Sequence, residues 1–309
     1  IIKHQAFHDA LTGLPNRRLL LESLSHALSR AKRNNTLAAV LFIDLDDFKK
    51  INDTAGHHHG DKFLIAVSER IKRCVRGSDV FGRSGGDEFL IICEDIQNIN
   101  EVHFTYKRIL ESFQAPLSVA PQSYIVSCSI GVSVFPNDGR SAEMLIQRAD
   151  TAMYEAKRQG KNNCQMFHSQ LEKKALNKLS IENALRDAIQ EDKLDIHFQP
   201  EVSIENGTTK ALEALVRWPQ TSGGNRAPSE FISIAEETGM IEAIGDWVIA
   251  QAFRDWYEIQ NCGFDQASLA VNVSAYQFKN ASSLIATIQK SLNDNPQFDT
   301  SKFAVELTE

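Results

Sequence analysis

Two acidic side chains follow a pair of glycines in the stretch FGRSGGDEFLII, residues 81–92, just before an apolar run. Glycines permit positive φ angles at a hairpin tip and leave bare backbone against which a ligand can lie. Asp87 and Glu88 would then lie beside a strand end, and Asp44 closes the apolar run TLAAVLFID. Two carboxylates on neighbouring strands, with coordination positions left open, suit Mg²⁺ bound together with substrate phosphates. The alternative is a polar turn with solvated acids, but the glycines and Asp44 together favour a metal site.

Alternating strand-like and helix-like segments surround these acids. The apolar run that ends at Asp44 predicts a strand buried on both faces. It is followed by a predicted loop, NDTAGHHHGD, and by helices and strands that we place as follows: a helix at about 61–75, a hairpin at 79–95, a helix at about 100–115, a strand at about 123–135 and a helix at about 141–159. This β-α-β-β-α-β order predicts a ferredoxin-like α/β (α+β) domain, with helices backing a mainly antiparallel sheet.

The second half of the chain has a different pattern. Residues 164–191 are rich in charges and helix formers, which predicts a helical connector. Four strand-like runs follow, LDIHFQP, KALEALVRW, LAVNVS and FAVELTE, and each carries a polar residue at or near its end. Such groups at successive strand ends build the active site of a β/α barrel, which takes about 250 residues. From Ser180 onward about 130 residues remain, so we expect a partial, TIM-like barrel that stops about halfway.

Composition limits the classes of function. A net charge of −7 argues against nucleic acid as the main partner, although it leaves phosphate ligands open. Five scattered cysteines without metal-pair spacing indicate a reducing, cytoplasmic environment and neither a disulfide framework nor a zinc site. No apolar run is long enough for a membrane span within this chain. The first residue is Ile, so we expect a trimmed piece of a longer parent that could be membrane-anchored upstream.

Several blocks occur in an order that resembles the GGDEF-type diguanylate cyclases, through residues 8–164. They are HDALTGLPNRR, FIDLDDFKKINDTAGHHHGD, GGDEF, SIGVSVFPNDG and ADTAMYEAKRQGKN. The resemblance implies a cyclase-palm fold that condenses two GTP molecules into cyclic di-GMP and two pyrophosphates. Each 3′-hydroxyl would attack an α-phosphate with the help of Mg²⁺ or Mn²⁺. Because one site holds one GTP, closing the symmetric product calls for a homodimer.

The same resemblance assigns catalytic and metal-binding roles. Asp44 and Asp87 would be the metal carboxylates, and the carbonyl of Leu45 would help. Glu88 is a candidate for metal binding or for accepting the 3′-hydroxyl proton.

Further residues would bind the nucleotide. Asn52 and Asp61 match the guanine contacts, because a carboxylate accepts from the N1–H and N2–H₂ donors and an amide donates to O6. The alternative for Asp61 is a helix cap. The phosphate-binding candidates include two lysines four residues apart at a helix end, where the alternative is a simple interaction with the helix dipole. The full set of GTP contacts is Asn52, Asp61, Lys49, Gly85, Gly86, Lys157 and Lys161.

The sequence RGSD, residues 76–79, lies at the spacing from the hairpin at which the family has an inhibitory product site. Arg76 would contact phosphate and the guanine edge of cyclic di-GMP, and Asp79 would accept from the guanine donors.

The second half resembles the EAL-type cyclic di-GMP phosphodiesterases through FQP, EALVRW, APSEFISIAEETGMI, VNVS and ELTE. The resemblance implies a metal-activated water that hydrolyses cyclic di-GMP to pGpG. It makes Glu213, Asn272 and Glu306 the metal ligands, gives substrate binding to Gln199 and Arg217, and has Glu309 support a nearby loop. Since the family's remaining ligands would follow Glu309, we expect hydrolysis from the complete parent and not from this chain.

The boundaries that we expect are residues 1–165 for the cyclase domain, 166–179 for the connector and 180–309 for the partial phosphodiesterase domain. The alternative to this enzyme is a regulatory module that senses GTP or cyclic di-GMP, with only one or neither domain catalytically active.

Overall fold

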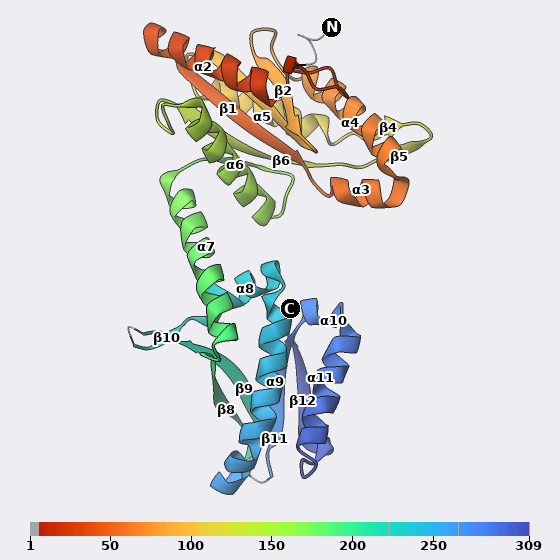
Figure 1. Cartoon of the computed structure of the whole chain (residues 1–309), viewed down its shortest axis with the longest axis vertical. Coiled ribbons are helices and arrows are strands. Elements are labelled where there is room, and N and C mark those ends of the chain that lie inside the picture. The colour runs from red at the N-terminus through yellow and green to blue at the C-terminus, as the bar shows by residue number, and fades with distance from the viewer. Residues whose placement is uncertain (1–5, 222, 265, 309) are drawn as a thin grey trace. The chain divides into compact units, whose positions relative to one another are not determined.

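The computed structural model describes residues 6–221, 223–264 and 266–308 (Figure 1). The chain divides into two compact units between Ala175 and Leu176, and each unit has its own hydrophobic core. Among the described residues, the helices are all too short or too polar to cross a membrane.

A five-stranded sheet forms the centre of the first unit, in the order β2-β3-β1-β6-β7. Its strands are β1 (Leu37–Leu45), β2 (Val80–Gly85), β3 (Glu88–Ile96), β6 (Cys128–Phe135) and β7 (Cys164–Met166). Strand β1 is antiparallel to both β3 and β6, and β7 adds a parallel edge next to β6. The arrangement confirms the ferredoxin-like order predicted from the sequence.

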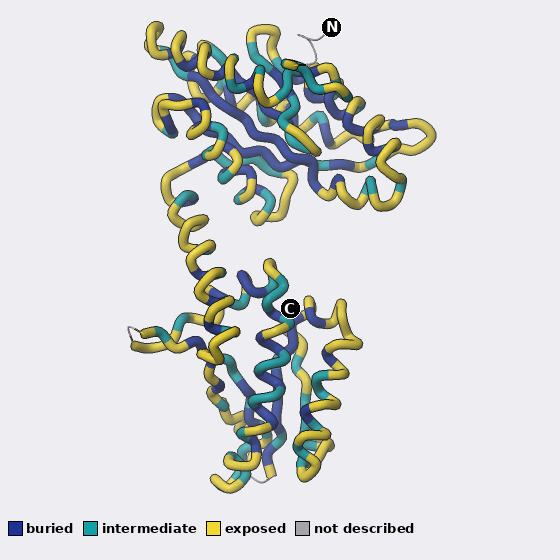
Figure 2. The backbone as a smooth tube through the Cα atoms, viewed as in Figure 1, coloured by how far each residue is buried: buried dark blue, intermediate teal, exposed yellow. Residues whose placement is uncertain are grey.

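Helices cover both faces of this sheet. Helices α2 (Arg17–Asn34) and α6 (Ala142–Arg158) pack on one face, and α4 (His57–Lys72) and α5 (Asn100–Ser112) pack on the other. Strand β1 lies between these layers and is buried at every residue after Leu37 (Figure 2). The expectation of a strand buried on both faces is therefore confirmed, and it leaves the polar end of β1 inside the fold.

Close packing of α6 on β6 depends on Gly131. A Cβ atom at this position would lie 1.9 Å from the carbonyl oxygen of Ala149 and 2.1 Å from the backbone nitrogen of Met153. Such distances are far below van der Waals contact, so a larger residue would push the helix away from the sheet. The bare backbone of Gly131 thus lets the end of α6 approach the end of β1.

Two of the predicted boundaries are wrong. The segment NDTAGHHHGD is not a loop, because it forms the end of α3 (Phe48–Ala55) and the start of α4. Gly56, with a φ of 80°, changes the chain direction between these helices on its own, so no longer loop is needed. The strand expected at about 123–135 begins at Cys128. The residues just before it form β5 (Gln122–Tyr124), which pairs with β4 (Leu117–Val119) in a separate two-stranded sheet.

The second unit contains the parallel strands of a β/α barrel, in the order β9-β11-β12. Its strands are β8 (Asp195–Val202), β9 (Thr209–Pro219), β10 (Asn225–Arg226), β11 (Ser268–Ser274) and β12 (Phe303–Thr308). Its helical segments are α7 (Ser169–Gln190), which begins in the first unit, α8 (Pro228–Thr238), α9 (Met240–Ile259), a π-helical turn (Gln260–Phe264), α10 (Ala275–Phe278), α11 (Ala281–Asp294) and a 3₁₀ turn (Thr300–Lys302). This arrangement agrees with the TIM-like architecture predicted for the second half. One strand differs in direction, because β8 is antiparallel to β9.

Candidate functional site

The hairpin between β2 and β3 turns at Gly86 and Asp87, because Gly85 pairs with Glu88. Gly86 has a φ of 50°, a left-handed conformation that glycine adopts without strain. A Cβ atom at either glycine would meet nothing within 4 Å, so the backbone at the tip is open to a ligand. Across the sheet, Glu88 pairs directly with Asp44 of β1. The two segments that carry the acids therefore lie side by side, as expected.

The acids interact electrostatically. Asp44 is only 7% exposed, and this burial raises its pKa; the charge of Asp87 adds to the increase, while a hydrogen bond from Lys157 opposes it. Burial also raises the pKa of Glu88, and the charges of Asp150, Asp44 and Asp87 act in the same direction. Mutual repulsion among partly buried carboxylates is relieved by a cation. The donor set therefore fits a divalent metal ion with oxygen ligands.

Two of the three candidate phosphate lysines reach this end of β1. The Nζ atom of Lys157 lies 2.8 Å from Oδ1 of Asp44, and that of Lys161 lies 3.0 Å from Oδ2 of Asp47. The third candidate, Lys49, is exposed on α3. Two amines are thus held next to the acids, where a bound polyphosphate would need them.

Each unit has a cavity of about 380–420 Å³ that is lined by at least one candidate site residue. In the first unit, a cavity of about 420 Å³ lies beside Glu88 and is also lined by Arg17, Ser84 and Asp150. In the second unit, a cavity of about 380 Å³ is lined by Arg217 among others.

The two candidate guanine contacts lie together because of a glycine. A Cβ atom at Gly60 would lie 2.0 Å from Oδ1 of Asn52, so the amide of Asn52 packs against the backbone of α4. Asp61 is the next residue of that helix and is exposed. The capping alternative for Asp61 is wrong, because α4 begins at His57 and its cap position is Gly56.

Arg76 and Asp79 lie in the turn before β2. The backbone N–H of Asp79 donates to the carbonyl of Arg76 at 3.1 Å. Burial raises the pKa of Asp79, and the charge of Arg76 opposes the increase. The guanidinium of Arg76 is paired with Glu101 of α5, with 2.7 Å between Nη1 and Oε2. A ligand of Arg76 would therefore have to compete with Glu101.

The hairpin is held in place by an arginine that the sequence analysis did not single out. Arg83 of β2 donates from Nη1 to both carboxylate oxygens of Asp9, at 2.9 and 3.1 Å. Its Nε and Nη2 atoms donate to the carbonyl of Gly86 at 3.0 and 2.6 Å. Although burial acts in the opposite direction, hydrogen bonds from Thr12 and Arg83 hold the pKa of Asp9 below its usual value. Arg83 thus ties the hairpin tip to the segment before α2, over a sequence separation of 74 residues that no local pattern reveals.

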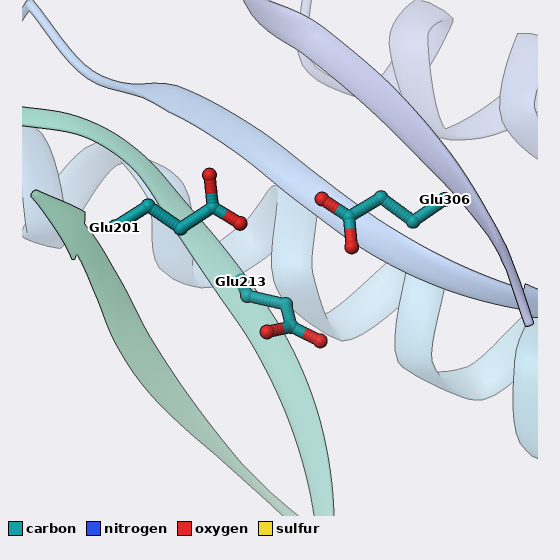
Figure 3. A group of neighbouring side chains, drawn as sticks. All are labelled: Glu201, Glu213 and Glu306. Atoms are coloured by element: carbon teal, nitrogen blue, oxygen red, sulfur yellow. The ribbon is translucent and has the colours of Figure 1, made fainter. Parts of the chain in front are cut away.

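Three carboxylates gather in the second unit. Glu201 of β8 and Glu306 of β12 point toward each other, Glu213 of β9 lies beside them, and one carboxylate oxygen of each lies within 4.8 Å of the others (Figure 3). Asn272 of β11 pairs with Glu306 in register, and its amide donates to Glu213. Burial and the charges of the other two glutamates raise the pKa of Glu306. The set fits a divalent cation, and Glu201 is a member that the sequence did not single out, two residues beyond Gln199.

Two further candidates of the second unit lie on β8 and β9. Gln199 lies opposite Glu213 on the antiparallel strand β8 and is exposed. Arg217 donates to the neighbouring carbonyl of Val216 at 3.0 Å. Glu309 lies outside the described residues.

Comparisons with known proteins agree with the division of the chain into two units. The family model described as "Diguanylate cyclase, GGDEF domain" matches residues 6–163, and the model of the EAL domain matches residues 182–309. The bifunctional diguanylate cyclase/cyclic di-GMP phosphodiesterase MucR of Pseudomonas aeruginosa is 38% identical over 304 residues, which cover 98% of this chain and 44% of MucR. The cyclic di-GMP phosphodiesterase NbdA of the same organism is 38% identical over 281 residues, covering 91% of this chain and 36% of NbdA. The chain thus spans less than half of the length of these curated relatives.

Solved structures give the same result for the first unit. The GGDEF domain of TpbB, also called YfiN, from P. aeruginosa is 36% identical and superposes with a TM-score of 0.53. The match covers 54% of this chain and 97% of that structure.

The anchor of the hairpin can be tested by Arg83→Ala. The side chains of Arg83 and Asp9 are only 10% and 22% exposed, so the change leaves a largely buried carboxylate without its partner. We expect the free energy of unfolding to fall by about 2 kcal/mol and amide exchange in residues 81–92 to accelerate, as measured by denaturant titration and by hydrogen exchange with mass spectrometry. The control Lys107→Ala breaks an exposed pair with Glu111 and should cost less than about 1 kcal/mol. Unchanged exchange in the hairpin would contradict the anchoring role.

Proposed function

Since this chain belongs to the GGDEF family of diguanylate cyclases and also carries an EAL domain, we propose that its first unit condenses two GTP molecules into cyclic di-GMP and two pyrophosphates. The observation that carries the proposal is the pairing of Asp44 with Glu88 beside an open glycine turn, with Lys157 on Asp44. Enzymes of both families generally depend on divalent cations. Here we propose Mg²⁺ or Mn²⁺.

We assign the roles of the residues from the family resemblance, and the placement of Asp44, Glu88 and Lys157 supports the assignment. Asp44 and Asp87, with the carbonyl of Leu45, hold the metal, which when bound stabilises charge on the α-phosphate and the leaving pyrophosphate. Lys157 and Lys161 bind phosphate oxygens. Glu88, whose pKa burial raises, is the candidate to accept the 3′-hydroxyl proton.

Asn52 and Asp61 select guanine in this proposal. The Asp61 carboxylate accepts from the N1–H and N2–H₂ donors, and the Asn52 amide donates to O6. Adenine would leave these groups partly unpaired, a penalty large enough to discriminate strongly between the two bases. The exposure of Asp61 leaves its carboxylate accessible to a base.

The active form that we propose is a homodimer. Cyclic di-GMP has two-fold symmetry, and each unit binds one GTP, so two copies must face each other for both phosphodiester bonds to close.

The metal assignment is tested by Asp87→Asn, which removes one charge and preserves the shape of the turn residue. We expect the rate of GTP conversion to cyclic di-GMP to fall at least about 100-fold, because the charge that develops in the transition state loses its stabilisation. Product formation in Mg²⁺ or Mn²⁺ is followed by chromatography, and circular dichroism checks the fold. The control Asp95→Asn changes an exposed aspartate near the far end of β3, the strand that follows the turn, and should keep the wild-type rate. Full activity of Asp87→Asn would disprove the metal role.

We also propose that Arg76 and Asp79 form an inhibitory site for cyclic di-GMP. In Arg76→Ala the cation that binds the product's phosphate is lost, so the concentration of cyclic di-GMP that halves the rate should rise about tenfold. The initial rate without product should stay the same, because Arg76 lies outside the acid cluster. The control is Arg73→Ala, an exposed arginine at the end of α4. Identical inhibition curves for Arg76→Ala and the wild type would refute the site.

A second function is favoured by the three carboxylates of the second unit. We propose that Glu213, Asn272 and Glu306 hold a divalent cation of a cyclic di-GMP phosphodiesterase site, and that Gln199 and Arg217 bind the substrate. Hydrolysis to pGpG is the activity expected of the full-length protein. The alternative is a unit that only binds cyclic di-GMP and regulates the first.

Metal binding by the second unit is tested by calorimetric titration of Mn²⁺ into the Asp87→Asn protein, in which the cyclase site is weakened. Adding Glu306→Gln should reduce the remaining affinity about tenfold or more, because a charged ligand is lost. The control is Glu205→Gln, an exposed glutamate in the turn between β8 and β9. Equal affinity in all three proteins would rule out the proposed ligand set.

A further inference from the structure

Three aspartates at the end of β1 contact the segment in which α6 ends and turns toward β7. Asp44 pairs with Lys157, and Asp47 pairs with Lys161. Between them, Asp46 accepts a hydrogen bond from the backbone N–H of Asn162 at 3.1 Å. The two lysines to which we assign phosphate binding are therefore connected to the strand that carries the proposed metal ligand.

Asp46 differs from Asp44 in how its carboxylate is satisfied. Asp46 is 6% exposed, and its Oδ1 accepts from the hydroxyl of Ser129 at 2.7 Å. Its Oδ2 accepts from the hydroxyl of Ser127 at 2.7 Å and from Asn162. A buried carboxylate with three donors is compensated without a cation. Asp46 is therefore a structural acid and not a second metal ligand, although the sequence places both acids alike at the end of one strand.

The turn that Asp46 contacts has an unusual backbone. Lys161 has a φ of 61° and Asn162 a φ of 49°, both in the left-handed region that non-glycine residues rarely occupy. Such a conformation persists only when the surrounding structure fixes it. The side chain of Asn163 holds the turn to α6 through the carbonyl of Ala156 at 2.8 Å. On the β1 side, the backbone contact is the hydrogen bond to Asp46.

The pair between Lys161 and Asp47 is a weaker constraint. Its side chains are 43% and 45% exposed, and solvent screens ion pairs of this kind. Asp47 also pairs with Lys50 at 3.1 Å, so its carboxylate is shared between two amines. The position of Lys161 is thus determined more by the buried hydrogen bond to its neighbour's backbone than by its own side-chain partner.

We propose that Asp46 is a positioning residue for the triphosphate: by fixing the turn at Asn162, it places the amine of Lys161 where a phosphate of the bound nucleotide lies. This inference rests on the proposed function, in which Lys161 binds phosphate. Asp46 acts through Lys161 and does not itself touch the nucleotide or the metal.

The experiment is a double-mutant cycle between Asp46 and Lys161. The readout is the affinity for a non-reactive GTP analogue with a methylene bridge between the α- and β-phosphates, in Mg²⁺, measured by calorimetry. Asp46→Ala and Lys161→Ala should each weaken binding about tenfold, and the double variant should be weakened about tenfold as well, because residues that act as one unit are not additive. Asp46→Asn keeps the shape of the side chain, guards against a folding defect in Asp46→Ala and should give an intermediate loss.

A structural role alone would give a different pattern. If Asp46 only stabilised the fold, its loss would lower the melting temperature, and its effect on binding would be the same with and without Lys161. Asp53→Asn, which removes a charge from an exposed position of α3, controls for the general loss of negative charge and should not weaken binding. Binding losses that multiply to about 100-fold in the double variant would overturn the inference. Failure of the wild type to bind the analogue would overturn the proposed function, and the inference with it.

Discussion

The first unit depends on the burial of negative charge at the end of β1. Asp44 lies in this strand, which is covered on both faces, and Asp46 follows it directly; the two residues are 7% and 6% exposed. A buried carboxylate is costly unless it is paired or fully hydrogen-bonded. The two acids meet this requirement in different ways: Asp46 is satisfied by the protein alone, while Asp44 has Lys157 on one oxygen and other acids nearby. The acid left with unbalanced negative charge around it is the one that suits a cation.

The elements around β1 supply the partners that these buried carboxylates require. Helix α6 must come close enough for its last turn to supply the amine of Lys157, and for the turn that follows it to supply the N–H of Asn162; Gly131 permits that approach. On the other side, Arg83 restrains the hairpin that carries Asp87 through its carbonyl contact with Gly86. Hydrogen bonds to charged groups contribute about 1.5–3 kcal/mol each, against at most about 1 kcal/mol for exposed ion pairs. The largely buried contacts of Asp46 and Arg83 therefore determine the geometry more than the exposed pair of Asp47 does.

The order of strands and helices could be predicted because each element has a local pattern in the sequence. The apolar run of β1, the glycine turn and the alternation of helices with strands are each read within about ten residues. The errors came from elsewhere: a polar, histidine-rich stretch resembles a loop until one sees that Gly56 alone separates two helices. The contact between Asp9 and Arg83 joins residues 74 positions apart, and Glu201 joins its cluster only through the antiparallel pairing of β8 with β9. No local spacing in the sequence encodes such contacts, so they become visible only in the folded structure.

The negative charge of the acid cluster in the second unit is less well compensated by neighbouring groups than the charge at the end of β1. Among the described residues, the side-chain hydrogen bond that this cluster receives comes from the amide of Asn272, which is neutral and donates to Glu213. An amide contributes a hydrogen bond but no positive charge, so the repulsion among the three carboxylates is not offset as it is between Asp44 and Lys157. A bound cation would therefore offset the repulsion among these carboxylates more fully than the neighbouring side chains do. The same electrostatic argument separates the two acidic sites: the carboxylate of Asp46 is compensated within the protein, whereas the three glutamates are not, which makes this cluster the candidate for a bound cation.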